Sequence, residues 1–365
     1  MSKTGVISMG VKAPIIRRGD NLEDIVIECV EDALLENGMT IQDGDIIGIT
    51  ESVVARAQGN YITVDDIVQF LEEHKYPKQL GLYEPIFSRN RFSMMLKGFA
   101  RYADKIVIYH SDYDTQGDPC NYPNPFTGVD IKEYYTELCK AENCELEFDS
   151  SDMVGERNDQ VFDIDARCHP GFKPSLVDIL NTPVRHEDGT LSGHNKDWGL
   201  LGSNKATEES LKLFPRKEEA QNLVNGIQSF YKNVVGKNVE VLVYGDGCFK
   251  SPEYQGVSIW EFADPVATVV HTQGLEGMPN EIKLKAFADD KYKDLQGIKL
   301  ENAIKEEIKA NENGSSLVGS MTAQGTTPRR YTDLLASLMD LTTGSGSKGT
   351  PIVIIKNYFK NYADE

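Results

Sequence analysis

The stretch Val239-Glu-Val-Leu-Val-Tyr244-Gly245-Asp246-Gly247-Cys248-Phe249-Lys250 is the most informative part of this chain. Its β-branched, apolar run predicts a buried strand, and the Gly-Asp-Gly that ends it predicts a turn where a ligand can approach the backbone. Open sheets place their chemistry at the carboxyl ends of strands, so the sequence predicts that Asp246 binds a metal ion. The segment alone leaves open a turn aspartate that accepts hydrogen bonds from its own backbone.

The net charge and the composition exclude some classes of protein. The chain has 365 residues and a formal net charge of −19, which argues against a nucleic-acid or anionic-membrane surface. Anionic small ligands remain compatible, because a divalent metal with a few Lys and Arg residues reverses the local sign. The first residues do not resemble a signal peptide and no apolar run is long enough to span a bilayer, so we expect a cytoplasmic protein. The 6 cysteines predict reduced thiols rather than a disulfide scaffold.

Hydrophobic periodicity predicts most of the regular structure. Helices are expected over residues 22–34, 64–74, 88–100, 217–233 and 331–341, with further helix within 281–310. Strands are expected over residues 45–50, 105–110, 161–165, 239–245 and 352–355. We expect three parts: an N-terminal part (1–185) with a divergent segment at about 80–180, a site-bearing part (186–289), and a C-terminal part (290–365) whose helices and strand return to the first.

Two loops are candidates for binding phosphate. The composition of residues 199–207 predicts a loop that leads into the N-terminus of a helix, where Ser203, Asn204 and Lys205 would bind an anion. The alternative is that these residues only cap the helix. Residues 324–330 place Thr326, Arg329 and Arg330 before the next helix. Arginine binds phosphate or carboxylate bidentately, and a solvated surface pair is the alternative. Further carboxylates beside loops are candidates only: Glu51, Asp130, Asp197, Glu261 and Asp264.

In their shared order these segments resemble the coenzyme F(420)-0:L-glutamate ligase family, the non-grasp gamma-glutamyl ligases. The stretch Asp43-Gly-Asp-Ile-Ile-Gly-Ile-Thr-Glu-Ser52-Val-Val-Ala-Arg-Ala-Gln-Gly59 resembles the family's Asp-Gly-Asp strand and its Lys-x-Val-Ser-Lys-Ala-Glu-Gly stretch. Gly199-Leu-Leu-Gly-Ser-Asn204 is similar to its Ala-Gly-Val-Asp-x-Ser-Asn motif, and residues 239–250 to its Ser-Asp-Thr-Phe-Gly site. The resemblance covers about the first 60 residues and those after 180.

Three departures distinguish this chain from the family pattern. The family's metal-binding Asp in Ala-Gly-Val-Asp aligns with Leu201, so that ligand is missing or comes from elsewhere, with Asp197 and Asp130 as replacements. The Ser and Thr beside the site aspartate become Gly245 and Gly247. The Glu of the family's closing Ala-Asp-Glu helix becomes Leu334. These changes bear on the deazaflavin substrate more than on the fold.

The resemblance implies an α+β fold of two interlocked subdomains of mixed sheets and helices, assembled as a homodimer. It also implies a GTP- or ATP-dependent ligase that uses Mg²⁺ or Mn²⁺ to join glutamate to a small carboxylate acceptor through an acyl phosphate. Asp246 would hold the metal, with Asp130 or Asp197 as a second ligand. Its partner in catalysis would be Lys250. Phosphate or the acidic substrates would be held by Ser203, Asn204, Lys205, Thr326, Arg329 and Arg330. The alternative is a non-catalytic nucleotide- and metal-binding regulatory protein of the same fold.

Overall fold

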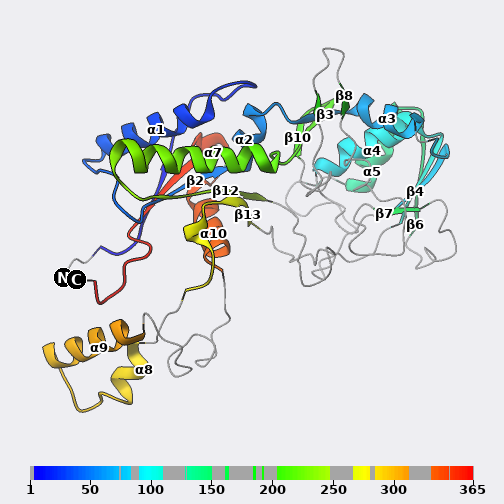
Figure 1. Ribbon diagram of the computed structural model, residues 1–365. Helices are drawn as coiled ribbons and strands as arrows, with labels where there is room; N and C mark the ends of the chain where they lie inside the picture. Colours follow the sequence, from blue (N-terminus) through cyan, green and yellow to red (C-terminus); the bar gives the residue numbers. More distant parts are fainter. Residues whose placement is uncertain are drawn as a thin grey trace.

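The computed structural model describes the greater part of the chain. The described residues are 4–73, 75–83, 90–109, 128, 130–149, 161–163, 184–185, 191–192, 204–246, 266–279, 284–311, 330–344 and 346–364. They form helices together with mixed, parallel and antiparallel sheets, so the α+β class is confirmed (Figure 1). Within them, no helix is both long and apolar enough to cross a membrane.

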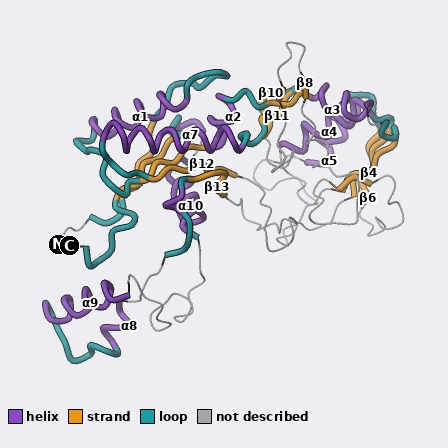
Figure 2. Tube along the Cα trace, viewed as in Figure 1, coloured by secondary structure: helices purple, strands orange, loops and turns teal. Residues whose placement is uncertain are grey.

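A five-stranded sheet forms the centre of one lobe (Figure 2). Its strand order is β1-β14-β2-β12-β13. Its strands are β1 (Ile7–Val11), β14 (Ile352–Lys356), β2 (Ile46–Thr50), β12 (Glu240–Asp246) and β13 (Val266–His271). β2 and β12 run parallel, and every other neighbouring pair in this sheet is antiparallel. The C-terminal strand therefore lies between two strands from the first fifty residues.

Helices cover both faces of this sheet (Figure 1). One face carries α1 (Leu22–Glu36), α2 (Glu51–Ala57) and α7 (Lys217–Phe230), and the other carries α10 (Tyr331–Thr343). Side chains of a strand alternate between faces, and the buried residues divide in the same way. Val241 and Val243 pack with the α1 and α7 layer, whereas Leu242 and Tyr244 pack against α10.

A buried ion pair joins the two ends of the chain within this sheet. Asp45 precedes β2 and is 2% exposed, and Lys356 ends β14 and is 8% exposed. The Lys356 ammonium donates to the Asp45 carboxylate and, at 2.9 Å, to the carbonyl oxygen of Thr40. The carboxylate also accepts from the backbone N–H of Gln42 at 2.8 Å. Each buried charge is therefore compensated by the other and by backbone groups.

A second lobe is built on a parallel sheet with the order β6-β5-β4-β7. The strands are β4 (Gln79–Tyr83), β5 (Lys105–Tyr109), β6 (Glu145–Asp149) and β7 (Val161–Asp163). The helices α3 (Val64–Glu73), α4 (Asn90–Tyr102) and α5 (Ile131–Ala141) share one apolar core with it. Most of this lobe comes from the segment at 80–180 that matched no motif of the resemblance.

A small antiparallel sheet lies between the two lobes (Figure 1). It consists of β10 (Asn204–Thr207), β11 (Ser210–Lys212) and β3 (Tyr61–Thr63), and a separate hairpin pairs β8 (Val184–Arg185) with β9 (Leu191–Ser192). The expectation that residues 199–207 lead into a helix N-terminus is therefore wrong for 204–207. Leu211 and Leu213 are buried with period-two spacing, and pairing with β3 satisfies the backbone groups of β11 in a sheet.

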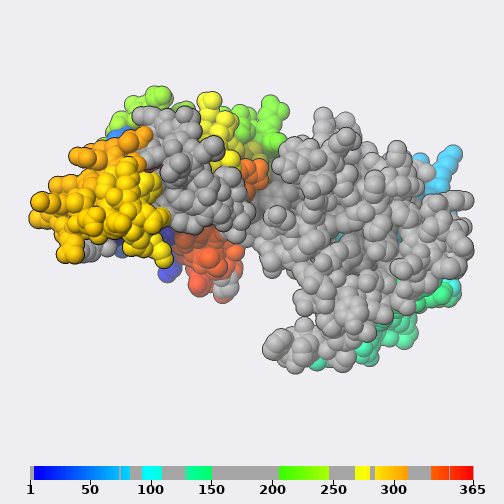
Figure 3. Space-filling model, turned by 90° about the horizontal axis from the view of Figure 1, so that it is seen from below, coloured from blue at the N-terminus to red at the C-terminus, as the bar shows by residue number. Residues whose placement is uncertain are grey.

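The remaining helices lie toward the C-terminus. α8 (Leu284–Asp289) and α9 (Ile298–Asn311) form a small cluster with Ala363. Seen from below, their residues gather at one end of the molecule (Figure 3). Short 3-10 helices occur at Gln273–Leu275 and Gly346–Lys348, and a π-helix over Tyr231–Val235 follows α7. The predicted helices at 22–34, 64–74, 217–233 and 331–341 are confirmed within a few residues, whereas α2 was not predicted.

Candidate functional site

The parallel pairing of β2 and β12 brings two chain segments to the same edge of the sheet. Thr50 at the end of β2 is in register with Tyr244 of β12. Glu51 therefore leaves β2 where Gly245 and Asp246 end β12. The Tyr244 hydroxyl is hydrogen-bonded to the Thr343 hydroxyl of α10, which fixes this end of β12 on the helix below. The predicted strand is thus confirmed, but Gly245 and Asp246, which were predicted to form a turn, belong to β12 and pair with Ala267 and Val266 of β13.

Gly245 is a glycine because another side chain occupies its place. A Cβ atom added at Gly245 would lie 1.8 Å from Oε2 of Glu51, and Glu51 is only 7% exposed. The family motif has a serine at this position, and here the carboxylate of Glu51, the first residue of α2, fills the same space. Glu51 was named from the sequence only as a carboxylate beside a loop, because the pairing that brings it to Gly245 is nonlocal.

This contact makes a stability prediction. Gly245→Ala is expected to lower the free energy of unfolding by about 1–3 kcal/mol, because the new methyl group overlaps a buried carboxylate. Chemical denaturation measures this change. In a Glu51→Ala background the same substitution should have a smaller effect, since the overlapping atoms are gone. Gly346→Ala is the control, because nothing lies within 4 Å of a Cβ there. Equal losses in both backgrounds would show that the carboxylate is not the cause.

A lysine that the sequence did not single out lies beside this pair. Lys212 ends β11, and its ammonium donates to the hydroxyl of Ser52 on α2. Loss of water around the ammonium lowers the pKa of Lys212, and the positive charge of Arg56 lowers it further, whereas Glu51 acts in the opposite direction. Lys212 thus carries its charge in a partly dehydrated place at the site edge.

The small sheet positions Lys212. In the β-ladder Lys212 is opposite Asn204 on one side and Tyr61 on the other. Asn60 is fully buried, and its amide donates to the carbonyl oxygen of Phe214 at 2.7 Å. These contacts tie the residues after β11 to the residues after α2, so Lys212 and Ser52 are held at a fixed separation.

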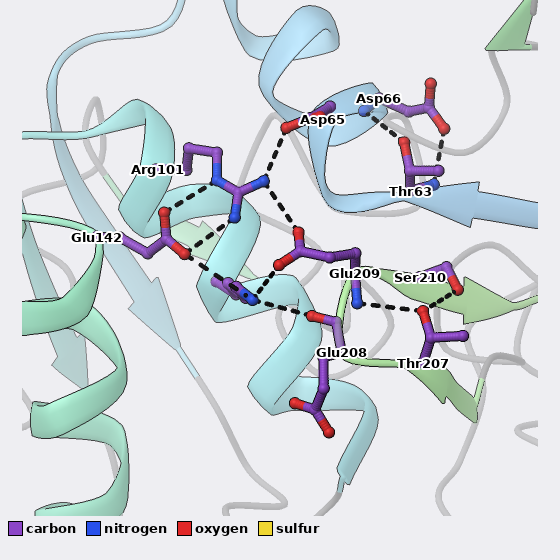
Figure 4. A network of polar contacts seen from close by, with 10 residues as sticks. Thr63, Asp65, Asp66, Arg101, Glu142, Thr207, Glu208, Glu209 and Ser210 are labelled. Carbon is purple, nitrogen blue, oxygen red and sulfur yellow. Dashed lines mark hydrogen bonds and ion pairs between the residues drawn. The ribbon is translucent and has the colours of Figure 1, made fainter.

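The turn of the β10–β11 hairpin is anchored by a network of charges (Figure 4). Arg101 of α4 donates to Glu142 through two nitrogens at 2.9 and 3.0 Å, and to Asp65 and Glu209 at 2.7 and 3.0 Å. These acidic partners, Glu142 first, raise the pKa of Arg101. Lys97, also on α4, donates to the Glu208 carbonyl oxygen at 2.9 Å and to the Glu209 carboxylate. The hairpin that carries Asn204 and Lys212 is therefore fixed to the second lobe.

Removing the centre of this network should have a modest, salt-dependent effect. Arg101→Met is expected to lower the free energy of unfolding by about 1 kcal/mol at low ionic strength, since its groups are partly exposed. The loss should shrink in high salt, which screens exposed charges. Denaturation with urea at two NaCl concentrations measures this. Lys140→Met, which removes a surface pair with Glu137 at 3.3 Å, is the control and should change stability little. A loss that is insensitive to salt would argue for packing rather than charge.

Residues 10–357 match the sequence model of the family described as F420-0:Gamma-glutamyl ligase. The chain belongs to this family. The match spans almost the whole chain, including the second lobe at 80–180, and confirms the resemblance.

Among curated proteins, this member of the F420-0:gamma-glutamyl ligase family is similar to the "Coenzyme F420:L-glutamate ligase" of Methanothermobacter thermautotrophicus. The two are 38% identical over 64 residues. That stretch covers 17% of this chain and 24% of the relative, so the similarity to this relative extends over less than a quarter of its length.

Four of the predicted site residues besides Asp246 fall among the described residues, and three have their own polar partners. Lys205 of β10 pairs with Glu208 at 2.6 Å. Arg330 precedes α10 and binds Asp333 through two nitrogens, both at 3.0 Å. Asp130 caps α5, where its carboxylate accepts from the backbone N–H groups of Lys132 and Glu133 at 2.9 and 3.2 Å. The fourth, Asn204, pairs in the ladder with Lys212.

The structure therefore brings Asn204 to the strand ends through the small sheet, whereas Asp130 belongs to the helical layer of the second lobe. The other predicted site residues lie outside the described residues: Asp197, Ser203, Lys250, Thr326 and Arg329. Within the described ranges, no group of three or more His, Cys, Asp and Glu residues could hold a metal ion. A metal site at Asp246 therefore stays a prediction.

Proposed function

We propose that this protein is a nucleotide- and divalent-metal-dependent ligase that forms a gamma-glutamyl-type amide bond on a small carboxylate acceptor. The observation that carries the proposal is membership of the gamma-glutamyl ligase family over residues 10–357. The arrangement of carboxylate, hydroxyl and ammonium groups at the joint end of β2 and β12 supports it, because open sheets bind ligands at this edge. The co-substrate is GTP or ATP and the amine is glutamate.

The chemistry requires activation of a carboxylate, which is a poor acyl donor. The acceptor carboxylate oxygen attacks the terminal phosphorus of the nucleotide, and the nucleoside diphosphate leaves. The glutamate amine then attacks the acyl carbon, loses a proton and expels inorganic phosphate. The contribution of the protein is to position the reactants and to neutralise phosphate charge. We assign phosphate contacts to Ser203, Asn204, Lys205, Thr326, Arg329 and Arg330, and charge neutralisation during transfer to Lys250.

For the metal we propose Mg²⁺ or Mn²⁺, held by Asp246. Carboxylate oxygens suit these hard cations, but the described residues supply too few ligands by themselves. Of the two predicted second ligands, Asp130 already caps α5 from the second lobe. We therefore favour Asp197, which lies outside the described residues. When bound, the metal would neutralise negative charge on the nucleotide phosphates.

The test is a coupled product assay. The protein is incubated with GTP or ATP, Mg²⁺ or Mn²⁺, L-glutamate and coenzyme F420-0, and in parallel with a panel of other small carboxylates. We expect one nucleoside diphosphate and one phosphate for each amide, with the product identified by mass spectrometry. Phosphate release without an amide would exclude a ligase, and so would the absence of both with every acceptor.

The regulatory alternative keeps nucleotide binding but has no turnover. It is favoured by Leu201 and Leu334, which replace acidic residues of the family motifs. A thermal-shift series with each nucleotide, measured once with metal and once with chelator, helps to distinguish the ligase from the regulatory protein. A ligand at 100 times its dissociation constant stabilises a protein by about 2.7 kcal/mol. A metal-dependent shift without turnover would support regulation, and light scattering would test the proposed homodimer in the same samples.

A further inference from the structure

The parallel sheet of the second lobe has a strand order that is typical of ligand-binding sheets. The chain runs from β4 through α4 to β5 and through α5 to β6, so the sheet first grows in one direction from β4. The next strand, β7, pairs with β4 on its other side. The strand order therefore reverses between β4 and β7. In open parallel sheets, ligands bind outside the carboxyl ends of the strands at the point of such a reversal.

One row of residues crosses the carboxyl end of this sheet. Tyr83, the last residue of β4, is in register with Tyr109, the last residue of β5, and with Asp163, the last residue of β7. Tyr109 is in turn in register with Asp149, the last residue of β6. The four strands therefore end at the same level, and each ends in a residue type that forms hydrogen bonds. The candidate site described above is separate, because it lies in the other lobe at the ends of β2 and β12.

The row lies on the face of the sheet opposite to the helices α3, α4 and α5. Leu82 of β4 and Ile108 of β5 belong to the core that the sheet shares with these helices. Successive residues of a strand alternate between the two faces, so Tyr83 and Tyr109 occupy positions of the other face. The two aspartates in register with them occupy the same face. The row therefore combines two phenols and two carboxylates along one edge of one face.

The residue types in the row indicate the chemistry of the ligand. Neighbouring strands lie about 4.8 Å apart, so Asp149 and Asp163, three spacings apart, are separated by about 14 Å and are too distant to share one metal ion. Carboxylates accept hydrogen bonds from hydroxyl groups, and a phenol both donates and accepts. Aromatic side chains also stack on nucleic-acid bases. A ribose with an attached base provides both the hydroxyl donors and the aromatic plane.

The segment that joins β4 to α4 favours a nucleoside over a dinucleotide. Residues 84–89 contain no glycine. Dinucleotide sites have glycines in the turn after the first strand, because the backbone must approach the pyrophosphate closely there. The negative charges of the two aspartates would also repel a pyrophosphate. A neutral, hydroxyl-bearing nucleoside fits the row better than an anion does.

We propose that the carboxyl end of the second-lobe sheet binds a nucleoside, with Asp163 and Tyr83 at the reversal of the strand order as the principal contacts. The strand order indicates where a ligand binds, and the row of phenols and carboxylates indicates which ligand. The nucleoside is either a free molecule or part of the nucleotide co-substrate, and only the second case rests on the proposed function. The site itself does not depend on catalysis.

The first experiment measures binding by calorimetry in the presence of chelator. The probes are adenosine, guanosine, cytidine and uridine, each compared with its 2′-deoxy form. We expect wild-type protein to bind at least one ribonucleoside and Asp163→Asn to bind it about tenfold more weakly, the usual loss when a charge-assisted contact is removed. The 2′-deoxy form should also bind more weakly than the ribonucleoside. Absence of binding of all four ribonucleosides to wild-type protein would overturn the proposal.

The matched control is Asp104→Asn. Asp104 is an exposed aspartate that directly precedes β5, so it lies at the amino end of the same sheet. This variant should bind the nucleoside as wild type does, and equal losses in both variants would overturn the proposal. If circular dichroism shows that Asp163→Asn does not fold, Tyr83→Phe provides the test, because it removes only a hydroxyl. We expect a loss of about fivefold there, and unchanged affinity would reject the site.

Two further measurements distinguish this site from the one at β12. Asp246→Asn should still bind the nucleoside in chelator, and a loss there without a loss in Asp163→Asn would place the nucleoside at β12 and overturn the proposal. GTP and ATP with Mg²⁺ then identify the source of the nucleoside. Weaker binding of a triphosphate to Asp163→Asn assigns the site to the co-substrate, and unchanged binding assigns it to a free nucleoside. Nucleoside binding through Asp163 in a protein that forms no amide would refute the ligase and leave this site standing.

Discussion

Asp246→Asn is expected to reduce metal-dependent amide formation by about 10²–10³-fold, the usual loss when a group that stabilises transferred charge is removed. The aspartate ends β12, and the adjacent strand β2 brings Glu51 to the same edge. The amide keeps the size of the side chain but removes the negative charge that a divalent cation requires. Steady-state kinetics with Mg²⁺ or Mn²⁺ measure the loss, and calorimetric metal titration shows whether it originates in binding.

The control for this prediction is Asp32→Asn, an exposed carboxylate on α1. It should leave turnover unchanged. Circular dichroism of both variants should match wild type, because Asp246 ends its strand at the sheet edge. Unchanged turnover in Asp246→Asn would remove the aspartate from the site, and the metal would then have to be held by other residues.

Asp45→Ala is expected to lower the free energy of unfolding by about 3–5 kcal/mol, the range for removing one partner of a buried ion pair. The substitution leaves the ammonium of Lys356 buried with only the Thr40 carbonyl oxygen as its remaining partner among these contacts. It also removes the acceptor for the Gln42 backbone N–H. Guanidinium denaturation followed by tryptophan fluorescence and circular dichroism measures the change.

A double variant tests whether the loss comes from the unpaired charge. Asp45→Leu with Lys356→Met replaces both charges by apolar groups and should recover much of the stability lost in the single variant. An exposed pair would lose no more than about 1 kcal/mol. A single-variant loss of that size would show that the pair contributes as a surface pair does, despite its burial.

Local periodicity predicted the elements that position the site. The apolar run before Gly245 and the run before Glu51 each form a strand, because alternating or continuous burial leaves a short-range pattern in the sequence. The strand β12 also includes Gly245 and Asp246, where a turn was predicted, because these residues pair with β13. The parallel pairing of these strands depends on residues two hundred positions apart. The sequence therefore located Asp246 but gave no reason to place Glu51 beside it.

Lys212 was missed for a related reason. In Ser210-Leu-Lys-Leu213 the alternation of buried leucines predicts a strand, and the lysine between them reads as an ordinary solvent-facing residue. Its partner Ser52 lies on α2, where the sequence predicts only the end of a strand. The resembling family stretch begins with a lysine at the position of Ser52, so one useful signal was the exchange of that lysine for a serine. The segment at 80–180 matched no family motif. Its helices and strands could therefore be predicted only one by one, and not as a lobe.

The position of β14 between β1 and β2 affects how the chain folds during synthesis. Until residues 352–356 leave the ribosome, β1 and β2 have no strand to join them and Asp45 has no ammonium partner. The parallel sheet of the second lobe has strands β4, β5 and β6 within about seventy consecutive residues, so it can form much earlier. The central sheet, with the predicted site at its edge, can therefore be completed only after the strands of the second lobe have been synthesised, and this late step is where we expect chaperones to act on the nascent protein.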